Sequence, residues 1–495
     1  MLFEAGRILT ALDQEFSRLA AQLGDHDVDG SSAQAIGNAL QLLRNRERGD
    51  VMAVRGQFGA LGTLLDRIDA LAAPAGPELA SAVAAIRATM ARVGFEGNLR
   101  LLESSWRDVV RELEQLMTRV RASGLADDRK MAIGRTFVAW ESGDLLTQAA
   151  SGAPGDSAQG AVEIQTENLT AYLRDRLGDP GLRVTTVCPL AGGFGKQTVL
   201  FDVEGTAMSG GFVMRRDIGR RASVPNDCHL TRQEFPVIMA ARARQFPAPD
   251  ALWVDTEHRL LPGGDFIIMR RSPGKLAGNF FGARTAIPPS LVDSLADIAA
   301  RLHALPPLYE LGNLTDSIRA DVWNLPLRHC TERYIRNWYE LFLREDHTPS
   351  PALIALYDWL LENVPDRQGC PVLLHGDIGF HNFLFDGDRL AAVLDWEFAH
   401  IGDPAEELGY IKVTVGAALD WERLMARYQA AGGSAVDPAT LRYFQVWAYA
   451  RNATAANLLS TLFNLGEVDD LKLAFLPVGH FPHFLRGAQA LIDAA

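Results

Sequence analysis

Residues 375–397 read HGDIGFHNFLFDGDRLAAVLDWE, and this stretch decides how we interpret the rest of the chain. Apolar residues precede it and recur through its second half, whereas Gly376-Asp377 and the Asp-Gly-Asp run at 386–388 are turn signals. The pattern predicts a strand–loop–strand unit with polar side chains on the loop and at the end of the last strand. Without its chemistry, the same stretch would read as two polar turns that join buried strands.

The polar residues of this unit have the types and the spacing that phosphoryl transfer requires. Such a reaction needs a carboxylate that orients the acceptor hydroxyl and takes its proton, and oxygen ligands for a Mg²⁺ ion that bridges the nucleotide phosphates. Asp377 supplies the first, while Asn382 and Asp395 supply the second. We therefore predict all three as catalytic residues, with Asn382 and Asp395 as metal ligands. The spacing H-x-D-x-x-x-x-N is that of the protein kinase catalytic loop.

A zinc site is the alternative reading of the same region. His381 and His400 flank the motif, and together with Asp377 and Asp395 they could supply zinc ligands. Oxygen ligands that include an asparagine suit Mg²⁺ better than Zn²⁺, so the sequence favours magnesium.

Composition excludes several classes of protein. The 495 residues are 48% hydrophobic and 22% charged, which is typical of a soluble chain of about three folding units. No apolar run is long enough to cross a bilayer, and the four cysteines form no C-x-x-C pair, so we expect no membrane partner and a cytoplasmic location. The net charge of −13 argues against nucleic acid as a partner.

The sequence pattern divides the chain into parts. Residues 1–150 have helical periodicity and predict an all-α bundle, and the small, Gly-rich run at 151–160 predicts a linker. Strand signals separated by one helical segment follow over 161–275, and residues 276–495 are mainly helical. The predicted fold class is α+β, with a small antiparallel-sheet lobe and a larger helical lobe after the N-terminal bundle.

The motif and its surroundings resemble a known family. HGDIGFHNFLF and, further on, AVLDWEFAHIGDPAEELGY are similar to the aminoglycoside phosphotransferase (APH) family, in particular to the branch that includes the kinase-like domain fused to certain acyl-CoA dehydrogenases. The resemblance covers about residues 160–460. It implies a bilobal, protein-kinase-like fold that binds ATP and Mg²⁺, with Asp377 near the acceptor hydroxyl. The family has Asp three residues after the proline of its G-D-P motif, where this chain has Glu407.

The resemblance also implies roles for residues in both lobes. Arg215 would contact the phosphates and Glu234 would pair with it; strand alternation favours Arg215 over Arg216. Lys196 follows a glycine-rich turn, but a solvated hairpin lysine is the favoured reading. The nucleotide-binding residues would be Gly192, Gly193, Phe194, Gly195, Arg215, Glu234, Met269 and Arg271. The candidate contacts to the acceptor are Glu397, Arg451 and Asn452.

These observations predict an ATP- and Mg²⁺-dependent kinase that phosphorylates a hydroxyl of a small molecule. The acceptor stays open: residues 350–420 hold twelve Asp and Glu against three Lys and Arg, which suits a cationic aminoglycoside, whereas a hydroxyacyl-CoA would need basic contacts. ATP and GTP are not distinguished. The alternative is a catalytically silent, nucleotide-binding scaffold that works through its N-terminal helices. Residues 1–150 could also form a homo-oligomer or bind a partner protein.

Overall fold

The computed structural model describes residues 57–93, 99–143, 163–190, 196–217, 230–278, 287–344, 347–464 and 471–494. These residues form two compact units. The helical unit takes its described residues from Met1–Ser157, Phe342–Asn363 and Tyr449–Ala495, and the mixed unit takes its own from Ala158–Leu341 and Val364–Ala448. The predicted linker at 151–160 lies outside the described residues, and the predicted boundaries of the domains stay predictions.

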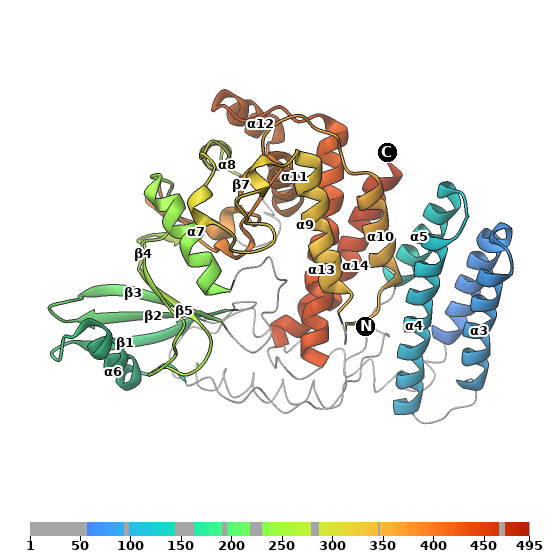
Figure 1. Cartoon of the computed structure of the whole chain (residues 1–495), viewed down its shortest axis with the longest axis horizontal. Helices are drawn as coiled ribbons and strands as arrows, with labels where there is room; N and C mark the ends of the chain where they lie inside the picture. Colours follow the sequence, from blue (N-terminus) through green and yellow to red (C-terminus); the bar gives the residue numbers. More distant parts are fainter. Residues whose placement is uncertain are drawn as a thin grey trace. The chain divides into compact units, whose positions relative to one another are not determined.

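The mixed unit contains a five-stranded antiparallel sheet, in the order β1-β2-β3-β5-β4 (Figure 1). Helix α7 connects β3 to β4 and therefore breaks the run of strands once, as the sequence predicts. The elements are β1 (Arg183–Leu190), β2 (Lys196–Glu204), β3 (Gly210–Asp217), α7 (Thr231–Ala243), β4 (Ala251–Asp255) and β5 (Phe266–Arg270). The α+β fold class, a small sheet followed by a larger helical part, is confirmed.

Helix α6 (Thr166–Leu177) precedes the sheet and was not predicted. Its first turn is closed by a capping box, in which the backbone N–H of Gln165 donates to Asn168 Oδ1 at 2.9 Å. Leu169 and Leu173 are fully buried against the sheet, and the Tyr172 hydroxyl donates to Asp255 at 2.9 Å. The helix thus covers one face of the sheet.

The start of helix α7 is fixed to the end of β3. The carboxylate of Asp217 accepts hydrogen bonds from the backbone N–H and the hydroxyl of Thr231, both at 3.1 Å. Farther along the helix, Val237 and Ile238 are buried in a cluster that also contains Trp396, which lies in the sequence between the motif hairpin and helix α11 (Pro404–Val415). Because cap and core both hold α7, the position of Glu234 between them is well defined.

The remainder of the mixed unit carries the motif. The predicted strand–loop–strand unit is confirmed: a short strand leads into the motif loop, and a hairpin follows. The strands are β6 (Lys275–Leu276), β7 (Val372–Leu374), β8 (Phe383–Asp386), β9 (Arg389–Val393) and β10 (His400–Gly402). The helices are α8 (Pro289–His303), α9 (Leu327–Phe342), α11 (Pro404–Val415), α12 (Trp421–Ala430) and α13 (Pro438–Asn464), with 3₁₀ turns η4 (Tyr309–Leu311), η5 (Val322–Asn324), η6 (Phe380–Asn382), η7 (Trp396–Phe398) and η8 (Gly416–Ala418). The first part of α13 belongs to this unit and the later part to the helical unit.

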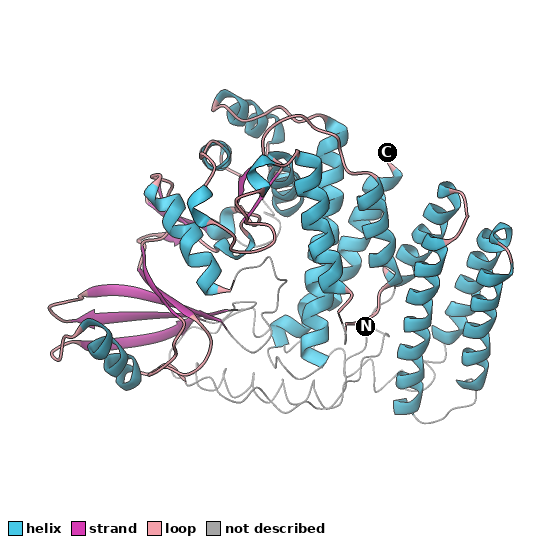
Figure 2. Ribbon diagram, viewed as in Figure 1, coloured by secondary structure: helices cyan, strands magenta, loops and turns pink. Residues whose placement is uncertain are grey.

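Helices make up the described part of the helical unit (Figure 2). Residues 57–72 are helical, and η2 (Ala73–Ala75), α3 (Pro77–Val93), α4 (Leu99–Ala122), α5 (Asp127–Glu141), α10 (Pro351–Glu362) and α14 (Leu471–Asp493) follow. Helix α10 packs on both α4 and α5, so part of the region 276–495 shares a core with the N-terminal helices. None of the described helices combines the length and the apolar character needed to cross a bilayer.

Candidate active site

The motif loop begins at the end of β7 and is held by main-chain contacts. Gly376 has φ +78°, and a Cβ added there would lie 2.3 Å from the carbonyl oxygen of Phe398, so only glycine fits. The N–H of Gly376 donates to Glu407 Oε1 at 2.8 Å. The ring of His375 lies with Nε2 2.9 Å from the carbonyl oxygen of Leu394, which ties the loop to the segment after β9.

Asp377 is 5% exposed, and both oxygens of its carboxylate have partners. The Tyr410 hydroxyl donates to Oδ1. His381 Nε2 lies 3.2 Å from Oδ2, and Asn382 Nδ2 donates to the same oxygen at 3.0 Å. Burial by itself raises the pKa of Asp377, but the charge of His381 and these hydrogen bonds outweigh it and lower the pKa to about 2. The carboxylate is therefore ionised at neutral pH and fixed in orientation.

A main-chain hydrogen bond joins the segments that carry Asn382 and Asp395. The N–H of Leu394 donates to the carbonyl oxygen of Asn382 at 2.8 Å, so the residue before Asp395 is attached to the end of the motif loop. Asp395 itself has φ +66°, which is unusual for a residue other than glycine. Strained backbone of this kind is concentrated at functional sites.

A cluster of charges lies beside Asp395, and we call it the cation cluster. It consists of the cations Lys196 and Arg215 and the carboxylates Glu234, Asp395 and Glu397. Lys196 Nζ lies 2.6 Å from Glu234 Oε2 and 3.5 Å from Glu397 Oε2. Arg215 contacts Asp395, lies 3.0 Å from Glu397 Oε2, and its Nε is 3.4 Å from Glu234 Oε2. The pairing of Arg215 with Glu234 is present, but Lys196 is the nearer partner of Glu234.

The two buried glutamates of the cluster have pKa values that are shifted in opposite directions. Burial raises the pKa of Glu234, but Arg215 and Lys196 outweigh it and lower the pKa to about 2. Burial and the neighbouring charge of Asp395 raise the pKa of Glu397 to about 7. Glu234 also accepts a hydrogen bond from the N–H of Trp396 at 3.2 Å, so α7 is joined to the residue that follows Asp395.

The reading of Lys196 as a solvated hairpin residue is wrong. Its side chain is 7% exposed. In the register of β2 and β3, Lys196 pairs with Asp217 and Thr198 pairs with Arg215, so Lys196 and Arg215 are diagonal neighbours on one face of the sheet. Arg216 bonds to Gln197, its partner in that register, at 2.7 Å. Strand alternation could have revealed Lys196 if the register had been known.

The G-D-P segment, Gly402-Asp403-Pro404, and the helix that follows it hold the motif loop in place. Asp403 caps α11 by accepting from the N–H of Ala405 at 2.9 Å, and it also binds Arg367. Glu407, which stands where the family has Asp, reaches the N–H of Gly376 and lies 3.0 Å from His303 Nε2. The longer side chain therefore has a defined structural partner in the motif loop.

The remaining predicted site residues lie apart from this group or cannot be placed in it. Glu397, predicted as an acceptor contact, is engaged by two buried cations, and we reassign it to the cation cluster. The backbone N–H of Arg271 donates to the carbonyl oxygen of Gly211 at 3.0 Å, so it is already used by the sheet, while the Met269 side chain is part of a buried core. Gly192, Gly193, Phe194 and Gly195 lie outside the described residues. Arg451 and Asn452 lie on the part of α13 that belongs to the helical unit, and their role stays a prediction.

The donor set of the motif fits a hard divalent cation. Asn382 uses Nδ2 for its bonds to Asp377, which leaves the amide oxygen Oδ1 outside those bonds, and Asp395 offers a carboxylate that is 31% exposed. Oxygen donors of these types are the ligands of Mg²⁺. Among the described residues, no group of three His, Cys, Asp or Glu is arranged to hold a metal, and His400 is instead stacked on Tyr334 with ring centroids 3.7 Å apart. The described residues therefore bring no set of zinc ligands together.

Comparisons with known proteins give several relatives. Human acyl-CoA dehydrogenase family member 11 is 26% identical over 275 residues, which are 53% of this chain and 33% of that protein. This chain thus spans about a third of the length of such relatives. Viomycin phosphotransferase of Streptomyces vinaceus is 42% identical over 65 residues, 12% of this chain and 21% of that protein. A solved ternary complex of aminoglycoside phosphotransferase APH(4)-Ia with ADP and hygromycin B shares 18% identity at a TM-score of 0.42, covering 65% of this chain and 98% of that one.

A family model also matches this chain. The model of the phosphotransferase enzyme family APH matches residues 186–444, more than half of the chain, and this range contains the motif loop and all members of the cation cluster. The resemblance that the sequence suggests is confirmed. The chain belongs to the phosphotransferase enzyme family.

Proposed function

We propose that the protein is an ATP-dependent kinase that transfers the γ-phosphoryl group to a hydroxyl of a small molecule. The acceptor oxygen forms a bond to the γ-phosphorus, the bond from that phosphorus to the β–γ bridging oxygen breaks, and ADP leaves with the bonding electrons. The hydroxyl proton passes to Asp377. The observation that carries the proposal is the fixed, ionised carboxylate of Asp377 on a loop that is hydrogen-bonded to the segment leading to Asp395.

In this proposal Asp377 mainly orients the hydroxyl. A carboxylate with a pKa of about 2 is a weak base. Phosphoryl transfer passes through a loose transition state, in which the acceptor needs alignment more than early loss of its proton. Tyr410, His381 and Asn382 hold the carboxylate, and the proton moves late to an oxygen that is already positioned.

The cation cluster supplies the second part of the site. Asn382 and Asp395 would hold Mg²⁺, which when bound neutralises charge on the phosphates. Arg215 contacts Asp395 and Glu397 with its guanidinium, and a guanidinium can bind a phosphate through two hydrogen bonds. Lys196 keeps Glu234 neutralised, so that Arg215 can exchange a carboxylate for a phosphate without leaving Glu234 unpaired.

Two classes of acceptor deserve a direct comparison. The relatives named as acyl-CoA dehydrogenases suggest a hydroxyacyl-CoA, whereas the short match to viomycin phosphotransferase suggests a cationic antibiotic. The similarity to the acyl-CoA dehydrogenases extends over half of this chain, so we favour a hydroxylated metabolite of the acyl-CoA type.

ADP release with purified full-length protein tests the proposal. We expect turnover with Mg·ATP on at least one member of a panel of hydroxyacyl-CoAs and aminated antibiotics. Asp377→Asn should lower turnover by about 10²- to 10⁴-fold while nucleotide binding persists. Asp388→Asn is the matched control, because Asp388 is an exposed carboxylate of the β8–β9 hairpin. Nucleotide binding without turnover on any acceptor would favour the scaffold alternative.

A further inference from the structure

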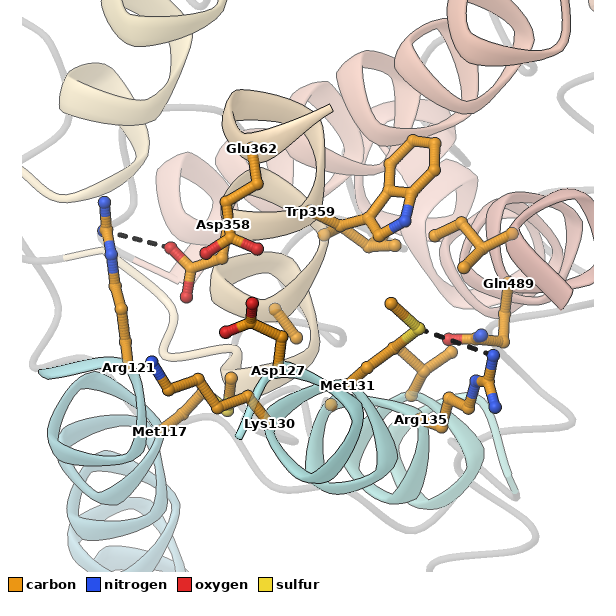
Figure 3. Close-up of a pocket in the computed structure, with 15 residues that line it drawn as sticks. Met117, Arg121, Asp127, Lys130, Met131, Arg135, Asp358, Trp359, Glu362 and Gln489 are labelled. Carbon is orange, nitrogen blue, oxygen red and sulfur yellow. Dashed lines mark hydrogen bonds and ion pairs between the residues drawn. The ribbon is translucent and has the colours of Figure 1, made fainter. Parts of the chain in front are cut away.

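A pocket in the helical unit lies among α4, α5, α10 and α14 (Figure 3). Its cavity measures about 60 Å³. Helices α5 and α10 touch at its wall, since a Cβ added to Gly134 would lie 3.0 Å from the Cβ of Ala355. Two of the helices that line the pocket are therefore packed against each other, so the pocket is a defined feature of this unit.

Carboxylates gather at one end of the pocket. Figure 3 shows Asp358, Glu362 and Asp127 at this end, and the first two are one turn apart on α10. Asp358 is 8% exposed, and no described residue forms a hydrogen bond with either of its carboxylate oxygens. Its ion pair among the described residues is with Arg121, whose Nη1 lies 3.0 Å from Oδ1 and whose side chain is 41% exposed. A buried carboxylate with so few partners is costly unless a ligand completes its bonding.

The charges of the pocket leave room for one more cation. The three carboxylates at this end face two cations, Arg121 of α4 and Lys130 of α5. Arg135, which also lines the pocket, is bound to Asp493 at 2.8 Å. Burial raises the pKa of Asp358 to about 7; Arg121 and Lys130 lower it and Glu362 raises it, so the two cations do not compensate for burial. A ligand with a single positive charge would balance this end.

The other end of the pocket is mostly apolar, with Arg135 and Gln489 at its edge in Figure 3. Trp359 and Met131 lie there in Figure 3, and Val138 and Leu356 also line the cavity. The face of a tryptophan ring attracts cations as well as alkyl groups. The volume is well below the roughly 150 Å³ of a cavity that holds benzene, so the buried part of a ligand must be short.

We propose that this pocket binds a small organic cation, with a primary ammonium group against Asp358 and Glu362 and a short alkyl stem against Trp359. The ammonium group donates hydrogen bonds to the unpaired Asp358 oxygen, and the stem fills the apolar end. This site belongs to the helical unit and does not depend on the function proposed for the mixed unit.

Isobutylammonium chloride is a suitable probe, with isobutanol as the uncharged probe of similar shape and ammonium chloride as the charge without a stem. Binding to the full-length protein is measured by saturation-transfer NMR and calorimetry at pH 8. We expect isobutylammonium to bind more tightly than either of the other two. Asp358→Asn should weaken it by about tenfold or more, since a charged hydrogen bond is lost. The same change at exposed Asp108 of α4, outside the pocket, should have no effect.

Folding is checked separately, by thermal unfolding of each variant. Asp358→Asn removes a buried charge, so it should not lower the melting temperature. Lowering the pH from 8 to 6 protonates Asp358 and should weaken binding of the ammonium probe, whose own charge persists. Equal binding of isobutanol and isobutylammonium, equal binding of ammonium ion alone, or unchanged affinity in a folded Asp358→Asn protein would each overturn the proposal.

Discussion

At the scale of single residues, Lys196 is the side chain whose importance is easiest to test. It is buried and bonded to Glu234, so Lys196→Met leaves Glu234 and Glu397 to share Arg215. Removing one partner of a buried ion pair costs about 3–5 kcal/mol. We expect a loss of this size in the free energy of unfolding, measured with denaturant. Lys275→Met, at an exposed position of β6, is the matched control and should change stability by no more than ~0.5 kcal/mol.

Lys196→Arg separates charge from shape. It should recover part of the stability and of the nucleotide affinity that Lys196→Met loses, because a buried cation again faces Glu234. A stable Lys196→Met protein with unaltered nucleotide affinity would show that Lys196 has no part in the cation cluster.

The Tyr410 hydroxyl holds the carboxylate of Asp377, and removing it is the second test at the scale of single residues. Tyr410→Phe removes a donor to Asp377 Oδ1 and should cost about 1–3 kcal/mol at pH 7. The pKa of Asp377 is lowered from 3.8 to about 2 by folding, so this stabilisation is present above pH 4 and is lost as the pH falls toward 2. The difference between wild type and variant should therefore shrink over that range. Tyr309→Phe, at a half-exposed hydroxyl, should show no such pH dependence.

Spacing along the chain predicts only part of the arrangement. Asp377, Asn382 and Asp395 lie within one strand–loop–strand unit, so their spacing is enough to place them in that unit. Lys196, Arg215, Glu234 and Glu397 come from β2, β3, α7 and η7, and their contacts depend on the strand register and on how α7 packs. Tyr410 reaches Asp377 from α11, and no local pattern announces that contact.

At the scale of elements, the connection from β7 into η6 depends on Gly376. Gly376→Ala places a Cβ 2.3 Å from the carbonyl of Phe398 at a positive φ, so the loop must shift. Gly387→Ala, in the β8–β9 hairpin, has a φ of +61° but no atom within 4 Å of the added Cβ. The second variant should cost about 1–2 kcal/mol for the backbone alone, and the first about 1–3 kcal/mol more. Denaturant midpoints give both values, and equal losses would contradict the steric argument.

Elements with strong local signals were predicted, and those defined by tertiary packing were not. The sheet strands are rich in β-branched residues and bounded by glycine-rich turns, and α7 ends in the alanine-rich run MAARA, so both were anticipated. Helix α6 contains three threonine or tyrosine residues among its twelve positions, and its apolar face has meaning only against the sheet that follows. Tertiary burial of Leu169 and Leu173 stabilises it where local preference is weak.

At the scale of the whole molecule, contacts between distant segments hold the helical unit together. Glu141 at the end of α5 is 4% exposed, and its carboxylate accepts a hydrogen bond from the N–H of Ala352 in α10 at 3.0 Å. Burial raises the pKa of Glu141 from 4.5 to about 7 in the folded protein. The protonated form is thus favoured by folding, and stability is lost as the pH rises from 4.5 through 7.

Glu141→Gln should remove this pH dependence. Relative to wild type, the variant should gain about 3 kcal/mol of stability between pH 4.5 and pH 7.5, measured by denaturant unfolding at several pH values. Glu78→Gln, at an exposed position of α3, is the control and should follow the wild type. A parallel pH profile for wild type and Glu141→Gln would mean that Glu141 remains charged in the folded state.

Helix α10 packs on helices that come more than 200 residues earlier in the chain, and this matters for designing truncated forms of the protein. Cutting the chain near residue 157 would remove α4 and α5, the helices against which Ala352, Ala355 and Leu356 of α10 lie. The shortened polypeptide would expose a hydrophobic face of α10 to solvent and would tend to aggregate. The N-terminal helices therefore cannot simply be removed, and a shortened protein would need either a redesigned α10 or co-expression of the N-terminal segment.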